Sequence, residues 1–256
     1  MVQADRDRTT LPSSTELPCS DDIPVDNENQ NFIPNLLLFL LEFIWGDRLD
    51  WYFGVDMAIY HTTGANPRVP LVPDGFLSVG VERRKQSLQG RGRLSYVLWE
   101  ENDIPPILTL EVVSQTYGNE YDEKMEIYAK LGVLYYVIYN PDYWRRDQHQ
   151  PLEVYKLVDG TYQLQIGEPL WMSEIGLGIG RFQYVANAVG REALTWYGET
   201  GTRYLSQAEV ERQRAEQERA ARLKAVSSLL EMGLGVEQVA EMLSLSIEEM
   251  LSAQKK

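Results

Sequence analysis

ILTLEVVS (107–114), QTYGNEYDEKMEIYAKLG (115–132) and VLYYVIY (133–139) follow one another directly in the chain. The first and third segments are apolar, β-branched and aromatic runs of strand length, and the middle one carries a helical pattern over about 119–131. A strand, a helix and a strand with short joins imply a crossover connection. We therefore expect at least one pair of parallel strands.

The rest of the chain adds further strands and one buried helix to this unit. The leucine-rich run Leu36–Trp45 predicts a helix that Gly46 ends. Earlier strands joined by turns can pair antiparallel, so the fold class is α/β, with a mixed β-sheet core flanked by helices. The additional strands are expected near 51–60, 70–79, 94–99, 152–158 and 161–166.

Composition divides the chain into three parts. Residues 1–31 are polar and acidic, and we expect this N-terminal tail to be disordered. Residues 32–202 form the α/β domain. Residues 203–256 form a helical extension, in which Ser206–Lys224 is a strong helix former and 229–251 holds two short amphipathic patterns, the second with Ser246 as its N-cap.

Composition also limits the function. A single cysteine, Cys19, excludes a disulfide framework, and two histidines leave no Cys/His zinc pattern. The apolar run before Gly46 is too short to span a bilayer and no signal peptide precedes it, so we expect a soluble, cytoplasmic protein without membrane contact. The net charge of −14 disfavours tight non-specific binding of nucleic acid but permits local contact.

Lys124 is the first candidate functional residue. On a helical wheel it lies within the apolar arc, four residues before Tyr128 and seven before Leu131. An unpaired ammonium is costly to bury, so we expect carboxylates or a substrate phosphate to lie close to Lys124. The alternative is a side chain that extends along the edge of the apolar face to solvent.

Two carboxylates supply possible partners. Glu111 interrupts a run that is apolar on both faces, where a carboxylate is costly unless it is paired or bound to metal. Asp74 ends the run Pro70–Asp74. The alternatives are a Glu111 that reaches solvent at the strand end and an Asp74 in an ordinary Pro-Asp-Gly turn. Two carboxylates and an ammonium suit Mg²⁺, with Mn²⁺ as a substitute, and hydrolysis of a phosphodiester by metal-activated water.

The ordered motifs resemble the Uma-two family of putative restriction endonucleases, of the PD-(D/E)XK nuclease superfamily. The resemblance covers roughly 35–185 and is carried by Pro73-Asp74, Leu110-Glu111-Val112-Val113-Ser114, Asp122-Glu-Lys124 with Tyr128, Gly132-Val133, Tyr135-Tyr136 and Asn140-Pro141. It implies a restriction-endonuclease-like core over 32–202 that cleaves DNA. It also implies that Asp74 and Glu111 bind Mg²⁺ together with the backbone carbonyl of Val112.

One departure from the superfamily pattern concerns the lysine. The superfamily usually places it two residues after the acid, where this chain has Val113, and the resemblance implies that Lys124 takes over its role. Glu42 is a candidate accessory acid, and Ser114 and Tyr128 are candidate hydrogen-bonding partners of the site.

Two further segments are candidate interaction sites. Glu82–Arg93 is basic within an acidic chain and supplies possible nucleic-acid contacts, although a solvated hairpin loop is the ordinary interpretation; its cations are Arg83, Arg84, Lys85, Arg91 and Arg93. The acidic C-terminal helices favour contact with a protein or a second copy over DNA. Two functions stay open: a Mg²⁺-dependent DNA endonuclease, and a non-catalytic interaction protein with a nuclease fold that uses its C-terminal helices.

Overall fold

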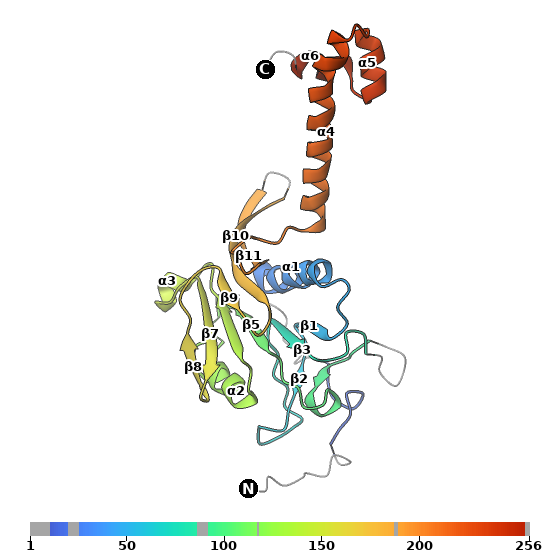
Figure 1. The fold of residues 1–256 in the computed structure, drawn as a ribbon. Helices are drawn as coiled ribbons and strands as arrows, with labels where there is room; N and C mark the ends of the chain where they lie inside the picture. The colour runs from blue at the N-terminus through green and yellow to red at the C-terminus, as the bar shows by residue number, and fades with distance from the viewer. Residues whose placement is uncertain (1–10, 20–25, 86–91, 117, 187–188, 254–256) are drawn as a thin grey trace. The chain divides into compact units, whose positions relative to one another are not determined.

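A computed structural model describes residues 11–19, 26–85, 92–116, 118–186 and 189–253. The chain divides into two compact units, residues 1–204 and 205–256. The first unit contains a central six-stranded sheet with the strand order β1-β3-β5-β6-β7-β8 (Figure 1). Its strands are β1 (Trp51–Val55), β3 (Gly75–Val79), β5 (Leu108–Val112), β6 (Tyr135–Tyr139), β7 (Leu152–Val158) and β8 (Thr161–Leu164).

The sheet is mixed, as the sequence predicts. Strands β5 and β6 are parallel, and helix α2 (Glu123–Leu131) connects them. The other neighbouring strands of this sheet pair antiparallel. Strands β5 and β6 are the two central strands of this sheet. Because they are parallel, their C-terminal ends lie at the same end of the sheet.

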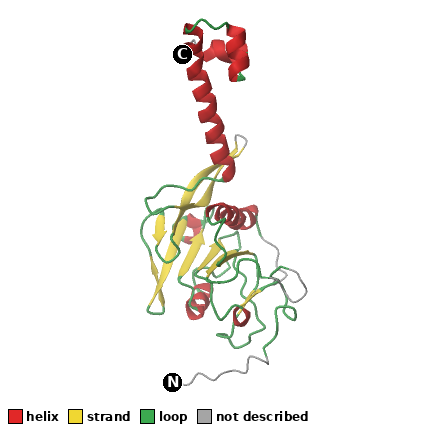
Figure 2. Ribbon diagram, turned by 45° about the vertical axis from the view of Figure 1, so that its right-hand side comes forward, coloured by secondary structure: helices red, strands yellow, loops and turns green. Residues whose placement is uncertain are grey.

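Helix α1 (Glu28–Ile44) and a second sheet cover one face of the central sheet (Figure 2). The second sheet is antiparallel and comprises β9 (Leu170–Met172), β10 (Leu177–Ala186) and β11 (Val189–Tyr197). Buried leucines of α1 pack with Leu110 and Val112 of β5 and with Trp196 of β11. The indole Nε1 of Trp196 donates a 3.0 Å hydrogen bond to the carbonyl of Leu37, which fixes α1 on this face.

The opposite face packs against α2. Its core joins Phe76 and Val113 to Tyr128, Leu131 and Tyr136. Four short elements complete the described part of the first unit: the parallel strands β2 (Ile59–Tyr60) and β4 (Tyr96–Val97), a 3₁₀ helix (Leu98–Glu100) and helix α3 (Trp144–Asp147).

The described parts of the N-terminal segment, residues 11–19 and 26–31, differ from the expectation of disorder over 1–31, and the rest of that segment lies outside the described residues. Leu17 is buried against Tyr60 and Val97, and the Tyr60 hydroxyl donates to the carbonyl of Pro18 at 2.8 Å. Helix α1 begins at Glu28 because the side chain of Asn27 accepts hydrogen bonds from two backbone N–H groups of its first turn. A few tertiary contacts thus order residues that composition alone assigns to a solvated tail.

The second unit consists of α4 (Gln207–Glu231), α5 (Val236–Leu243) and α6 (Ile247–Ala253). A capping box between Ser206 and Glu209 begins α4, and the Ser246 hydroxyl accepts from the backbone N–H of Glu249 as the predicted N-cap. The small core of this unit is formed by Val226, Val239, Ala240, Leu245 and Met250. Among the described residues, no helix is both long and apolar enough to cross a membrane.

Candidate active site

Glu111 lies on the central strand β5 and points toward α2. Side chains alternate along a strand, so Leu110 and Val112 face α1 while Glu111 faces the opposite side. Only 2% of its surface is exposed. A carboxylate at this depth requires partners.

Helix α2 provides two partners for this carboxylate. The ammonium of Lys124 lies 2.9 Å from Oε2 of Glu111, and the hydroxyl of Tyr128 donates a 2.6 Å hydrogen bond to Oε1. Lys124 and Tyr128 are four residues apart and so lie on the same side of the helix. The Lys124 side chain is 28% exposed, so it pairs with a buried acid and also reaches solvent.

Asp74, directly before β3, completes the group. Gly75 pairs with Leu110 in the antiparallel β3–β5 ladder, so Asp74 comes next to Glu111. One carboxylate oxygen of Asp74 accepts the backbone N–H of Val112 at 2.6 Å. The structure thus brings Asp74, Glu111, Lys124 and Tyr128 together near the C-terminal end of the central strand β5.

The cluster contains two carboxyl groups but one ammonium group. Burial raises the pKa of Asp74 well above its usual value, and the charge of Glu111 raises it further against the opposing effects of the Val112 N–H and Lys124. Burial also raises the pKa of Glu111, although Lys124 and Tyr128 partly offset it. Burial lowers the pKa of Lys124, but Glu111, Asp74 and Glu120 together more than compensate, so the net shift is upward. Two acids therefore share one cation.

A fourth ionisable group, Glu120, was not singled out in the sequence. It is only 4% exposed and accepts the backbone N–H of Gly118 at 3.0 Å. Its charge raises the pKa of both Glu111 and Lys124. Glu120 lies in a polar run with several other acids, where the sequence carries no signal that separates a buried carboxylate from its solvated neighbours.

The donor set suits a hard divalent cation. Asp74 and Glu111 offer carboxylate oxygens, and their surplus negative charge in a buried setting favours a metal ion between them. The described part of the chain contains no cluster of three or more His, Cys, Asp or Glu arranged around a metal position. A site with two carboxylates fits Mg²⁺ or Mn²⁺, because Mg²⁺ usually keeps several waters.

Two of the predicted accessory residues lie elsewhere. Glu42 is on the outer side of α1, across the sheet from Glu111, and forms an ion pair with Arg83. Ser114 has its hydroxyl 2.6 Å from a carboxylate oxygen of Asp26 and 2.9 Å from the carbonyl of Thr116. Neither contact involves the acids of the cluster, because Glu42 is on the wrong face and Ser114 lies beyond the end of β5.

The basic segment is largely neutralised within the chain. Arg83 stacks over Trp51 at 3.9 Å in addition to its ion pair with Glu42. Lys85 and the nearly buried Arg93 both contact the carboxylate of Glu101, at 3.1 and 2.9 Å. Arg84 is exposed and lines a cavity beside Trp51. Arg91 lies outside the described residues.

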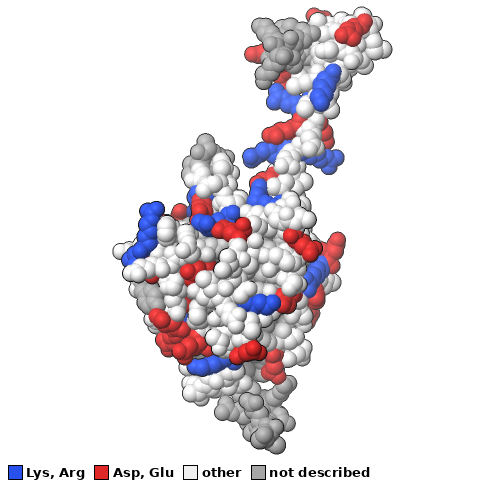
Figure 3. Space-filling model, turned by 60° about the vertical axis from the view of Figure 1, so that its left-hand side comes forward, with Lys and Arg blue, Asp and Glu red and all other residues white. Residues whose placement is uncertain are grey.

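The surface charge agrees with this local neutralisation. Figure 3 shows acidic and basic side chains interspersed on the face in view. Duplex DNA binding that tracks the backbone needs several cations directed at phosphates. On the face in view, the described residues form no continuous basic track of this kind.

A comparison with known protein families identifies the family of this chain. The family model described as "Uma2: Putative restriction endonuclease" matches residues 22–185, which is more than half of the chain. The matched span contains the six-stranded sheet and all four residues of the cluster. No curated protein and no solved structure matches the chain.

Proposed function

Because the chain belongs to the Uma2 family of putative restriction endonucleases, we propose that it is a divalent-metal-dependent endonuclease that hydrolyses phosphodiester bonds in DNA. The observation that supports the proposal is that Asp74, Glu111 and Lys124 lie together near the C-terminal end of the central strand β5. Buried acids with raised pKa values are typical of functional sites.

Asp74 and Glu111 would hold the metal ion, with the backbone carbonyl of Val112 as a further donor. When bound, Mg²⁺ would supply Lewis-acid activation of water and of the phosphoryl oxygen. The protein prepares both carboxylates for this role. The Val112 N–H orients Asp74, while Tyr128 fixes one oxygen of Glu111 and leaves the second to Lys124.

Lys124 acts as a cation in this scheme. Its pKa is raised by Glu111, so the side chain stays protonated at neutral pH and cannot serve as a general base. A fixed ammonium beside the metal ligands stabilises negative charge that develops on the phosphate in the transition state. Its partial exposure gives a substrate phosphate access to it.

Nicking of supercoiled plasmid DNA in the presence of Mg²⁺ tests the proposal. Asp74→Asn and Lys124→Ala should each lower the rate by at least about 100-fold, in the range seen on removal of electrostatic catalytic groups. Lys130→Ala is the matched control, because Lys130 lies on the same helix but is 69% exposed and pairs only with Glu126. Wild-type rates in Asp74→Asn would refute the assignment of the site.

A non-catalytic nuclease-fold protein is the competing candidate. This candidate is favoured because both carboxylate oxygens of Glu111 already have partners within the chain, Lys124 and Tyr128. Titration calorimetry with Mg²⁺ and Mn²⁺ separates the two functions. Heat of binding that disappears in Asp74→Asn supports the nuclease, whereas no binding by the wild type supports a scaffold whose C-terminal helices contact another protein.

A further inference from the structure

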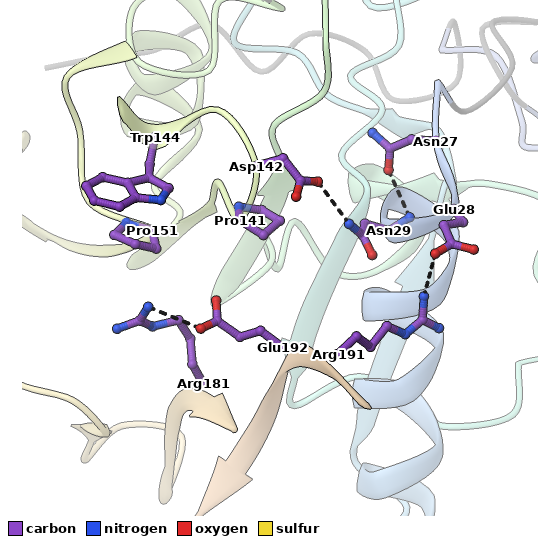
Figure 4. Close-up of a pocket in the computed structure, with 10 residues that line it drawn as sticks. All are labelled: Asn27, Glu28, Asn29, Pro141, Asp142, Trp144, Pro151, Arg181, Arg191 and Glu192. Atoms are coloured by element: carbon purple, nitrogen blue, oxygen red, sulfur yellow. Dashed lines mark hydrogen bonds and ion pairs between the residues drawn. The ribbon is translucent and has the colours of Figure 1, made fainter. Parts of the chain in front are cut away.

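A second cavity opens between the start of α1, the loop after β6 and the β10–β11 pair. Its volume is about 640 Å³. Figure 4 shows Trp144, Pro141 and Pro151 on one side and the α1 residues on the other. The lining consists of Asn27, Glu28, Asn29, Pro141, Asp142, Trp144, Pro151, Arg181, Arg191 and Glu192.

Two contacts connect this cavity to the proposed active site. Asp26, which precedes the lining residue Asn27, accepts the hydroxyl of Ser114, three residues after Glu111. Arg146, on the same short helix as Trp144, donates to the carbonyl of Gln115 at 2.9 Å. Residues close in sequence to two of the lining residues, Asn27 and Trp144, are thus hydrogen-bonded to the segment that follows β5.

The apolar wall offers a surface for stacking. Trp144 is partly exposed and lines the cavity together with two proline rings. The guanidinium of Arg145 lies over the Trp144 ring at 4.7 Å. Arg145 does not line the cavity and covers one face of the indole, so a flat heterocycle in the cavity would stack on the other face.

The polar wall does not suit a bare phosphate. Arg181 is held by Glu168 at 2.8 Å and by Glu192 at 3.4 Å, and Arg191 is paired with Glu28 at 2.9 Å. The lining contains three carboxylates against two guanidinium groups. The amide of Asn29 makes a long 3.3 Å contact with Asp142 and has a donor and an acceptor that a neutral ligand can use.

We propose that this cavity binds the base of an unpaired nucleotide in the substrate strand. The inference rests on the proposed nuclease function and names its substrate more closely: DNA with a single-stranded or extruded nucleotide. A neutral planar base fits the stacking wall and the amide edge, whereas a base stacked inside a duplex cannot reach Trp144. The neutralised arginines also explain why a mixed-charge surface can recognise this substrate without a long basic track.

Binding of a labelled single strand of about 12 nucleotides, in metal-free buffer, tests the inference. Trp144→Ala should weaken binding by about 5- to 150-fold, as expected when one base loses its aromatic partner, and Trp144→Phe should retain most of the affinity. A duplex of the same sequence should bind both variants as it binds the wild type. Trp45→Ala is the matched control, since Trp45 is also partly exposed and lies under an arginine, Arg48, at 4.4 Å.

The outcomes separate this inference from the proposed function. Unchanged single-strand affinity in Trp144→Ala, equal losses for single strand and duplex, or no binding of single strands by the wild type would each overturn the base site. Single-strand binding that depends on Trp144 in a protein without cleavage activity would refute the nuclease proposal and leave the base site standing. Thermal unfolding of each variant shows whether the fold is retained.

Discussion

Tyr128→Phe isolates the hydrogen bond that anchors the central acid of the cluster. Tyr128 is fully buried, and phenylalanine keeps its ring in the same packing against Tyr136, whose ring centroid lies 5.1 Å away. The substitution removes only the hydroxyl that donates to Glu111 at 2.6 Å. Burial raises the pKa of this phenol well above its usual value, so the hydroxyl stays a neutral donor at every accessible pH.

The size of the effect follows from the charge of the acceptor. A hydrogen bond to a charged group contributes about 1.5–3 kcal/mol, so the free energy of unfolding should fall by that amount at neutral pH or above. For a unit of this size the midpoint of thermal unfolding should drop by about 3–12 °C. At acidic pH, with Glu111 protonated, the loss should shrink toward that of a neutral hydrogen bond, about 1 kcal/mol.

The direction of the pH dependence follows from the raised pKa of Glu111. Folding favours its protonated form, so the stability that this form contributes is complete below the unfolded pKa and is lost as pH rises through the folded pKa. The variant lacks one group that stabilises the carboxylate, so its folded pKa lies higher still. The difference between variant and wild type should therefore grow as pH rises.

Urea unfolding over a pH series, followed by tryptophan fluorescence, measures this difference. Tyr136→Phe is the matched control because Tyr136 is equally buried but donates to a neutral backbone carbonyl, that of Glu120, at 2.7 Å. Its loss should be about 0.5–1.5 kcal/mol and independent of pH. Equal losses in the two variants at every pH would refute the reasoning, since Glu111 would then not be an ionised acceptor.

Three further predictions concern the charges of the cluster. Asp74→Asn should raise the free energy of unfolding of the metal-free protein by about 0.5–2 kcal/mol at neutral pH and by less in acid. The reason is that folding opposes ionisation of Asp74. Thermal unfolding in the presence of a chelator checks this. Mg²⁺ at about 100 times its Kd should stabilise the wild type by about 2.7 kcal/mol in a thermal-shift titration and leave Asp74→Asn unchanged. Lys124→Met should lower the free energy of unfolding, measured in urea, by about 1–3 kcal/mol because Glu111 loses its cation. Lys130→Met breaks an exposed ion pair and should lower it by about 0.3–0.5 kcal/mol.

Periodicity identified two residues of the cluster, Lys124 and Glu111, because each broke a pattern. Lys124 lies on the apolar side of α2, and Glu111 interrupts a strand that is buried on both faces. The parallel pairing of β5 and β6 followed from the same segment, since only a crossover can join them. These inferences depend on local sequence, which is why they needed no knowledge of distant contacts.

Other features depend on tertiary contacts and could not be read from one sequence. Strands β10 and β11 were missed, and β10 carries Gly178 and Gly180, which weaken the strand pattern. The start of α1 was missed because Pro34 lies inside that helix. Glu42 was assigned to the site because its helix was known but the face of the sheet that the helix covers was not.

The position of Lys124 has a structural reason in the packing around Val113. Val113 is two residues after Glu111 and only 1% exposed, and it packs in the same apolar cluster as Tyr128 and Leu131. An ammonium at that position would lie among apolar side chains, where it is costly. Lys124 instead approaches the carboxylate from the helix with its end open to solvent, so Glu111 keeps a cation while the interface between β5 and α2 stays apolar. A cation two residues after Glu111 would thus be buried among apolar side chains, whereas on α2 it reaches both the carboxylate and solvent.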